Sequence, residues 1–586
     1  MFKLLRTFFL FFVFNIIMLG ALSAQTITPT FHSFGIYYSP KEFIGECEVN
    51  YRVKGDKNWK EALPLWYDKR NKEYRGSIVN LSPGTTYEVQ IFPKESNKSK
   101  IITSRTWAEN FPIAKTIYLE KTSNKTLKIN ESGTSEGYIL YTYKPDEGRS
   151  AIDVNHERAN CVEVAEGTSF IILRGLTLKG AATHGIRIFN NCHDIIIEEN
   201  DISGWGSKAL DGWGKNRNSA IFSAKKHPNI ERIIIQKNKL HHPATDANSW
   251  VERRMNGSLH PAGPQAIHLA ESNGNHVIRY NEIYSDSAHY FNDAFGAAEN
   301  YSFRGFPNKD SDIYSNSISH CWDDGIESEG ANENVRIWDN YIDKTYVKIA
   351  IATVSKGPLY IWRNIANTSR KSGLTNDPDE YERGPFIKAG GQMKGGVFYG
   401  GGRTYVFHNT LLQAKSTGTT PLGCGSAIKS SGGNLYNVIS RNNIFLSYKR
   451  RIPTFLERAD SCTNDFDYDF YSGGITKFCN ESGYQKNGRL LQKEFPKFDE
   501  NHALIVGSIG IDAGTYIPNF SDNYLGEAPD VGAVESIHTA NKAAFKNTKK
   551  GSVLPFRRTV LLIAIALGLI VFISIRLLKF RKTAQN

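Results

Sequence analysis

A dense group of acidic side chains lies between residues 293 and 329 of the 586-residue chain. Its members are Asp293, Asp323, Asp324, Glu327 and Glu329. Carboxylates held close together raise one another's pKa or recruit a cation, because their like charges repel. Two kinds of chemistry follow: proton transfer by an acid/base pair, or coordination of a divalent cation such as Ca2+ by oxygen ligands.

The two chemistries give overlapping roles to these residues. For proton transfer, the candidate catalytic residues are Asp293, Asp323, Asp324, Glu327, His268 and Lys348. For a metal site, the candidate ligands are Glu327, Glu329 and Asp293. The alternative without function is a solvated, charged strand face, or carboxylates that cap turns beside glycines.

Short apolar strands that end in Asn must position these residues. This sequence pattern recurs between residues 195 and 445, with Asn at positions 200, 238, 281, 316, 340, 364, 409 and 443. Asn316, Asn340 and Asn364 are spaced by 24 residues, the length of one coil of a parallel β-solenoid, and larger gaps are coils with inserted loops. A β-propeller would need antiparallel four-stranded blades and blade motifs that the sequence lacks.

The recurring Asn has a structural explanation. A sharp bend between strands needs a residue that tolerates left-handed dihedral angles, and Asn does so better than other non-glycine residues. Stacked in successive coils, the amides can also hydrogen-bond along the solenoid axis as a ladder. We therefore predict that the Asn column is scaffold and not active site.

This pattern resembles the right-handed parallel β-helix superfamily of pectate-lyase-like proteins. The resemblance covers residues 109–535 and includes a closing segment, 528–535, similar to the last coil of many such proteins. It implies an all-β chain whose coils carry a groove for a polysaccharide. Aligning the coils on their Asn places Ile186, Ile267 and Ile326 inward, so that Arg187, His268 and Glu327 share one outward column.

The resemblance leaves the reaction open. Acid clusters on adjacent coils resemble those of polygalacturonase-type hydrolases, but the Gly-His-Gly and Arg-x-Lys motifs that should follow them are absent. Glu327-Ser328-Glu329 resembles the E-x-E calcium ligands of β-helical polysaccharide lyases, in which a Lys or Arg removes a proton from the uronate. The matching Lys is not at its expected place, and Lys348 stands in as a hypothesis. C5-epimerase chemistry is a third possibility.

Insertions that follow the Asn turns predict the walls of the groove. They bring Trp205, Trp213, Trp250 and Arg304, which together with Arg187 are the candidate substrate-binding residues. Aromatic faces and guanidinium forks suit an anionic sugar chain, although aromatic residues in loops can equally anchor those loops.

A small β-sandwich is predicted ahead of the solenoid, over residues 25–108. Alternating strands are broken by turn residues, which indicates antiparallel pairing. The run from Leu81 to Val89 resembles the tyrosine corner of fibronectin type III domains, with Tyr87 as the corner residue. This resemblance implies a spacer or a binding module.

The basic excess of the chain lies in its two ends. The net charge is +12, yet residues 25–540 hold equal numbers of basic and acidic residues, which excludes a phosphate-neutralising surface as the meaning of that charge. Residues 1–24 have the layout of a secretory signal peptide. We predict a basic stalk over residues 536–558, a transmembrane helix over residues 559–578 and a basic cytoplasmic tail over residues 579–586.

The seven cysteines are few for an exported chain and include no C-x-x-C pair, so most are expected to be small buried residues. Cys462 and Cys479 could close a local disulfide. Taken together, the sequence predicts an exported, membrane-anchored β-helix protein that acts on an acidic polysaccharide, without a nucleic-acid partner. The alternative is a non-catalytic surface protein that binds or organises glycan.

Overall fold

The computed structural model describes residues 24–94, 99–224, 226–297, 299–370, 384–412, 425–430, 433–447, 454–456, 463–476 and 484–537. Within these ranges no helix is long and apolar enough to cross a membrane. The predicted signal peptide and transmembrane segment, and Cys424, Cys462 and Cys479, lie outside the described residues. Cys47, Cys161, Cys192 and Cys321 are free and buried.

The N-terminal part consists of seven antiparallel strands in the order β1-β2-β5-β4-β3-β6-β7. They are β1 (Ala24–Pro29), β2 (Phe34–Ser39), β3 (Cys47–Val53), β4 (Lys60–Asp68), β5 (Glu73–Ile78), β6 (Thr86–Pro93) and β7 (Lys100–Arg105). Alternate side chains of β3 and β6 are buried, as the period of two requires. The Tyr87 hydroxyl accepts a hydrogen bond of 2.9 Å from the Ser82 backbone N–H, so this tyrosine ties the turn before β6. The fibronectin type III assignment itself remains a prediction.

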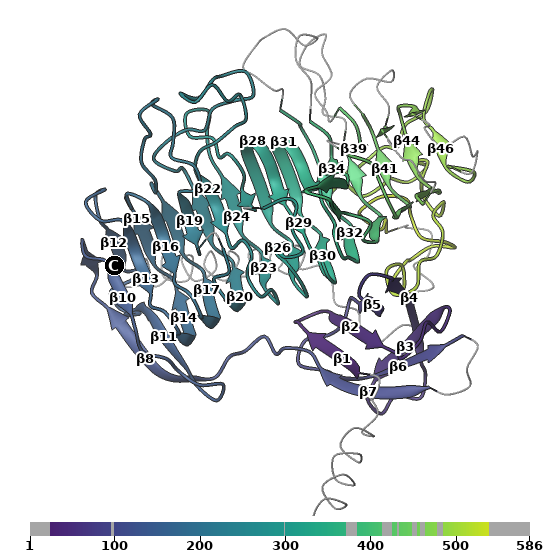
Figure 1. Ribbon diagram of the computed structural model, residues 1–586, viewed down its shortest axis with the longest axis horizontal. Helices are drawn as coiled ribbons and strands as arrows, with labels where there is room; N and C mark the ends of the chain where they lie inside the picture. Colours follow the sequence, from purple (N-terminus) through teal and green to yellow (C-terminus); the bar gives the residue numbers. More distant parts are fainter. Residues whose placement is uncertain are drawn as a thin grey trace, which may run out of the picture. The chain divides into compact units, whose positions relative to one another are not determined.

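The remainder is a parallel β-helix, which confirms the predicted solenoid and excludes a propeller. One wall is a 12-stranded parallel sheet in the described residues. Its strands are β8 (Ile113–Leu119), β11 (Tyr138–Tyr143), β14 (Ser169–Arg174), β17 (His193–Glu198), β20 (Glu231–Gln236), β23 (Val277–Arg279), β27 (Asp312–Tyr314), β30 (Val335–Trp338), β32 (Leu359–Trp362), β37 (Thr404–Phe407), β40 (Val438–Arg441) and β43 (Asp465–Phe466). Figure 1 shows how successive coils stack side by side.

A second, 23-stranded sheet forms the other walls in the described residues. Its strands are β9 (Thr122–Ser123), β10 (Leu127–Ile129), β12 (Ala151–Asp153), β13 (Asn160–Val164), β15 (Thr177–Lys179), β16 (His184–Ile188), β18 (Asp201–Ser203), β19 (Ser219–Phe222), β21 (Lys239–His241), β22 (Gln265–His268), β24 (Glu282–Tyr284), β25 (Phe295–Gly296), β28 (Ser317–Glu327), β31 (Tyr341–Ile351), β33 (Ile365–Ala366), β34 (Ile387–Ala389), β38 (Thr410–Leu411), β39 (Ile428–Ser430), β41 (Ile444–Phe445), β42 (Phe455–Leu456), β44 (Phe470–Tyr471), β45 (Ile475–Thr476) and β46 (Arg489–Leu490). Two short antiparallel pairs, β26 (Gly305–Phe306) with β29 (Glu329–Gly330) and β35 (Gln392–Lys394) with β36 (Val397–Tyr399), lie in the loops.

The Asn column forms the predicted ladder. Each Asn side chain donates to the side-chain oxygen of the next, from Asn200 to Asn443, at 2.9–3.1 Å. Asp469 ends the ladder as the acceptor of the Asn443 amide. The expectation of left-handed dihedral angles at the Asn is wrong, because the left-handed residue is the one before it. These preceding residues are Glu199, Lys237, Tyr280, Ser315, Asp339, Arg363, His408 and Asn442.

Buried polar contacts join the sandwich to the β-helix, and both belong to one compact unit that ends at Ser536. The fully buried Arg75 guanidinium pairs with Asp68 of its own domain and lies 3.4 Å from Glu333 of the β-helix. The Ser77 backbone N–H donates to the Tyr360 hydroxyl at 2.9 Å. Because buried charges are costly unless paired, this contact is a specific one and the sandwich is more than a loosely tethered spacer.

Candidate functional site

The strand register confirms the predicted columns. Ile186, Ile221, Ile267, Phe295, Ile326, Ile349 and Ile387 are register partners on consecutive coils, and all are buried. The following residues form the second column: Arg187, Phe222, His268, Gly296, Glu327, Ala350, Lys388 and Lys429. The site is therefore positioned by the repeat itself, since each coil contributes one residue to the column.

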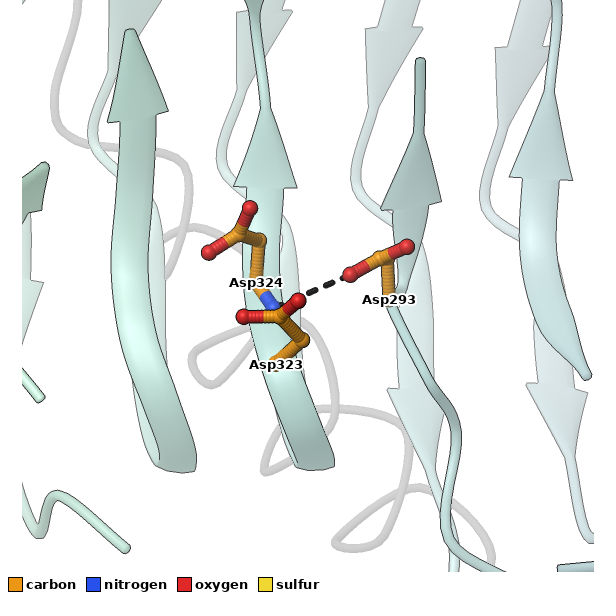
Figure 2. Close-up of side chains that lie close together, drawn as sticks. All are labelled: Asp293, Asp323 and Asp324. Atoms are coloured by element: carbon orange, nitrogen blue, oxygen red, sulfur yellow. Dashed lines mark hydrogen bonds between the residues drawn. The ribbon is translucent and has the colours of Figure 1, made fainter. Parts of the chain in front are cut away.

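The five predicted acids lie together. Oxygen atoms of Asp293, Asp323 and Asp324 all lie within 4.8 Å of one another, and so do those of Asp324, Glu327 and Glu329. Asp324 belongs to both groups. Figure 2 shows Asp323 and Asp324 on one strand and Asp293 on the neighbouring coil, where Asp293 Oδ1 accepts a 3.1 Å hydrogen bond from the Asp324 backbone N–H. Below, these five residues are called the acid cluster.

The acid cluster is buried, with residue exposures of 0–8%. The alternative of a solvated charged face is therefore wrong. Several carboxylates also bind backbone amides of neighbouring loops: Glu327 accepts from the Ala297 N–H, and Glu329 from the Ala352 N–H at 3.1 Å. Turn capping thus accounts for one oxygen of each glutamate but leaves the others for a different role.

A bulge in β28 contains Asp323 and ends at Asp324. The register with β31 shifts by one residue between Cys321 and Asp324, so that the strict alternation of the strand is interrupted there. Asp324 lies two residues before the inward Ile326, and its Oδ2 accepts a 2.7 Å hydrogen bond from Lys388 Nζ. Bulges of this kind re-aim side chains next to functional sites.

Lys388 is the residue that sequence reasoning missed. Its Nζ lies 2.7 Å from Asp324 Oδ2 and 3.4 Å from Glu329 Oε1. It shares the column of Glu327, and Ala350 on the intervening coil is small enough for the lysine to reach back over it. Extending the Ile326 alignment by two coils, to Ile349 and Ile387, would have found it.

Burial and mutual repulsion set the ionisation of the acid cluster. Burial, reinforced by Asp324, raises the pKa of Asp293 to about 7. Burial likewise raises the pKa of Glu329 to about 7, although Lys388 opposes this. The pKa values of Asp323 and Glu327 are raised well above the usual range for the same reason. Burial disfavours the charge on Lys388, but Asp324 and Glu329 outweigh it and raise the pKa of the lysine well above its usual value.

The oxygen atoms of the acid cluster suit a hard cation. Asp323 Oδ1, Asp324 Oδ1 and Glu329 Oε2 are buried and have no hydrogen-bond partner among the described residues. A buried acceptor without a donor is costly, and carboxyl groups this close repel one another once they ionise unless a cation lies between them. Carboxylate oxygens in this number are the ligands that Ca2+ takes, so the residues fit such an ion.

Of the other predicted residues, His268 and Trp250 lie next to the acid cluster. His268 is buried, and its Nδ1 lies 3.0 Å from Gln265 Oε1, while Gln265 Nε2 donates to Asp293 Oδ2 at 2.8 Å. The Trp250 ring packs 4.7 Å from the ring of His260, whose Nε2 lies 3.5 Å from Asp323 Oδ2. Because the His260 side chain is 63% exposed, this is where the cluster approaches solvent.

Three further candidates, Lys348, Trp205 and Arg304, are engaged by neighbouring residues of the fold. Lys348 is fully buried, and its Nζ donates to the Thr345 and Thr368 carbonyls. Trp205 is fully buried in the core with Nε1 donating to the Gln265 carbonyl, which leaves its ring no face for a sugar. The guanidinium of Arg304 donates to Asn273 Oδ1 at 2.8 Å and anchors a loop.

Arg187 and Trp213 lie away from the acid cluster. The Arg187 guanidinium stacks 4.3 Å over Phe189, and three coils separate this residue from Glu327 in the column. Trp213 lies in the loop after β18, where its backbone pairs with Ala209. No hydrogen bond or ion pair joins either residue to the acid cluster or to Lys388 among the described residues.

Known proteins resemble the chain in fold only. No family model matches it, and no curated protein matches its sequence. Among solved structures, pectate lyase Pel9A is 13% identical, with 72% of this chain and 86% of that chain covered and a TM-score of 0.33. An alginate lyase from Paenibacillus sp. strain FPU-7 is 10% identical, with 54% and 89% covered and a TM-score of 0.31.

An α-1,3-glucanase from Streptomyces thermodiastaticus strain HF3-3 is 12% identical, with 80% of this chain and 88% of that chain covered and a TM-score of 0.29. The solved structures that resemble the chain therefore include two polysaccharide lyases and a glucanase by their titles. The fold of the chain, a parallel β-helix, is shown by its own strand pairing. At these identities the reaction must be argued from the acid cluster and not from the neighbours.

Proposed function

We propose that this protein is a polysaccharide-active enzyme whose active site is the acid cluster together with Lys388. The observation that carries the proposal is the meeting of five buried carboxyl groups with one lysine on adjacent coils. A fold does not need such a group for stability, since apolar residues of similar size would serve as well or better. Perturbed ionisable groups of this kind are typical of catalytic sites.

Lys388 favours elimination over hydrolysis. The E-x-E pair, Glu327 and Glu329, lacked a basic partner in the sequence, and the structure supplies one at 3.4 Å from Glu329. In a β-elimination, Lys388 would take the proton next to the sugar carboxylate while the bond from C4 to the glycosidic oxygen breaks and a C4–C5 double bond forms. Asp293, with a pKa of about 7, would give a proton to the leaving oxygen.

A Ca2+ ion fits the second group of acids, Asp324, Glu327 and Glu329. When bound, it would neutralise the sugar carboxylate and so make the neighbouring proton more acidic. Asp324 and Glu329 are also the residues that keep Lys388 protonated. A bound Ca2+ ion would compensate the negative charge of these two carboxylates. The pKa of Lys388 would then fall towards the range in which a lysine acts as a base.

The substrate class is an anionic polysaccharide. Beside Asp323, the rings of Trp250, His260 and Tyr346 form an aromatic group, with Trp250 5.6 Å from Tyr346. Such faces pack against sugar rings, and the exposed His260 marks the approach to the acids. An acidic sugar is the class that elimination requires, because the reaction depends on a carboxylate beside the proton removed.

Export and membrane anchoring belong to the same proposal. The sequence of residues 1–24 and 559–578 supports a chain whose body lies outside the membrane, where polysaccharides of cell envelopes are found. A reporter fused after Asn586 should be active only in the cytoplasm. An exported reporter would contradict this topology.

Product analysis tests the proposal. Full-length protein with Ca2+ is incubated with a panel of uronate-containing and neutral polysaccharides, and unsaturated uronate is measured by its ultraviolet absorbance. We expect unsaturated products with uronate chains, lost in Lys388→Met and retained in Lys429→Met, which changes the lysine one coil further on. Reducing ends without unsaturation would indicate a hydrolase, and solvent deuterium at C5 without cleavage an epimerase. Binding without any product would leave a glycan-binding protein and refute the enzyme.

A further inference from the structure

The turn between β4 and β5 of the sandwich, residues 69–72, contacts loops of the β-helix. Arg70 in this turn donates from Nη1 to the Ser355 carbonyl at 2.8 Å and from Nη2 to the Gly400 carbonyl at 3.2 Å. Its guanidinium also lies 4.7 Å over the ring of Phe303. One side chain of the sandwich therefore contacts three separate loops of the β-helix.

Two of these loops adjoin the segments that present the acid cluster and Lys388. The loop of Phe303 continues into β26, which pairs with β29, the strand that begins with Glu329. The loop of Gly400 follows the β35–β36 hairpin, and β34, the strand that carries Lys388, leads directly into that hairpin. Burial raises the pKa of Tyr301, and Glu329 adds to this whereas Lys388 opposes it, so this tyrosine lies close to both groups.

Three aromatic rings on these loops form one group. The ring of Tyr399 lies 5.0 Å from that of Phe303 and 6.3 Å from that of Tyr301. All three residues are half-buried, and the exposed Lys394 places its Nζ 5.0 Å over the ring of Tyr301. Part of each aromatic side chain is therefore left to solvent beside an ammonium group.

The turn and the hairpin are both basic and contain no acidic residue. Residues 69–72 contribute the exposed Lys69, Arg70 and Lys72, and the hairpin contributes the exposed Lys394. Cationic side chains attract a polyanion, and aromatic faces pack against sugar rings. The combination suits a sugar chain that carries carboxylates.

We propose that the β4–β5 turn and the β35–β36 hairpin bind the part of an anionic polysaccharide that extends beyond the acid cluster. Tyr301 and Tyr399 pack against its sugar rings, and Lys69, Lys72 and Lys394 pair with its carboxylates. The sandwich is then part of the substrate-binding surface. This surface rests on the proposed function through its substrate class, and it does not depend on the elimination step.

Binding to immobilised polysaccharides tests this surface. Full-length protein in a non-ionic detergent is passed over polygalacturonate, alginate and neutral dextran, with EDTA so that no Ca2+ bridges the acid cluster to the sugar. We expect the wild type to bind at least one uronate chain and not dextran. In the triple variant Lys69→Gln/Lys72→Gln/Lys394→Gln, the Kd for that chain should rise about 10-fold, because each of three exposed ion pairs contributes modestly.

The matched control is Lys54→Gln/Lys57→Gln/Lys60→Gln. It removes the same charge from exposed lysines of the sandwich, at the end of β4 opposite the β4–β5 turn, and should bind as the wild type does. Circular dichroism checks that both variants fold. Equal binding by the two triple variants, or no binding of either uronate chain by the wild type, would overturn the proposal.

A polyglutamate surface separates sugar recognition from charge alone. Tyr301→Leu should weaken binding to the uronate chain and leave binding to polyglutamate unchanged, because only the sugar packs against the ring. Equal effects on the two surfaces would overturn the role of the aromatic group.

Turnover distinguishes a failure of this surface from a failure of the proposed reaction. If the wild type gives no product from any uronate chain and the Lys69/Lys72/Lys394 variant alone loses binding, the reaction is wrong and the surface stands. If the wild type cleaves a uronate chain, that variant should raise KM for the polymer. An unchanged KM together with unchanged binding would overturn the surface and leave the reaction intact.

Discussion

The Asn ladder and the acid cluster are both stacks of buried polar side chains on one β-helix, yet they differ in how their hydrogen-bonding groups are satisfied. In the ladder, Asn316 accepts from Asn281 and donates to Asn340 and to the Ile278 carbonyl, all within 3.1 Å. In the acid cluster, oxygens of Asp323, Asp324 and Glu329 have no such partner among the described residues. The satisfied stack holds the coils together, whereas the unsatisfied one is available to a ligand.

The largest expected difference between the two stacks is in catalysis. Lys388→Met should lower kcat/KM for the anionic polysaccharide by about 10²–10⁴-fold, the usual contribution of a residue that transfers a proton. Ca2+ binding should persist or tighten, because the lysine competes with the ion for Asp324 and Glu329. Kinetics with Lys429→Met as the control check this. Loss of Ca2+ binding together with activity would instead give Lys388 a structural role.

A substitution in the Asn ladder should lower the stability of the folded protein. Asn316→Ala leaves several buried polar groups of Asn281, Asn340 and Ile278 without hydrogen-bond partners. Each such unpaired group costs about 1–3 kcal/mol, so we expect the free energy of unfolding to fall by more than about 3 kcal/mol. Denaturant unfolding measures this, with exposed Asn124→Ala as the control. If the two substitutions cost the same, the ladder is not the scaffold that its hydrogen bonds indicate.

Much of this contrast could be predicted from the sequence. The repeat fixes the inward isoleucines and the Asn column, and coil alignment brings Asp293, Asp323, Asp324, Glu327 and Glu329 together. The alignment works because one coil spacing and a period of two determine where side chains point.

Other features depend on contacts that periodicity does not encode. Lys388 follows a long insertion after Asn364, so its distance from that Asn in the sequence does not match the other coils. Its strand, β34, nevertheless pairs in register with β31. Trp205 was expected at a groove but fills the core, because an aromatic residue in a loop can turn either way. The left-handed residue precedes the Asn, since the Asn side chain is already engaged by the ladder and the bend falls one position earlier.

The acid cluster should also make stability depend on pH. Glu329 has a pKa raised from 4.5 to about 7 by burial, so its protonated form favours the folded state. This contribution is present below about pH 4.5 and is lost as the pH rises through about 7. Between these values, Ca2+-free wild type should lose on the order of 3 kcal/mol relative to Glu329→Gln.

Thermal or denaturant unfolding across this pH range, without Ca2+, measures the difference. Glu282→Gln, whose side chain is 59% exposed on the same β-helix, is the matched control and should follow the wild type. Parallel pH profiles for all three proteins would show that Glu329 is not held in its protonated form by the fold.

Calcium binding tests most directly whether the acid cluster is a ligand site and not a second scaffold. Isothermal titration of metal-free, full-length protein with Ca2+ near pH 7 should show a single class of site that vanishes in Asp324→Asn, because Asp324 belongs to both groups of acids. Asn124→Ala should bind as the wild type does. No binding by the wild type, or equal binding by Asp324→Asn, would contradict the account.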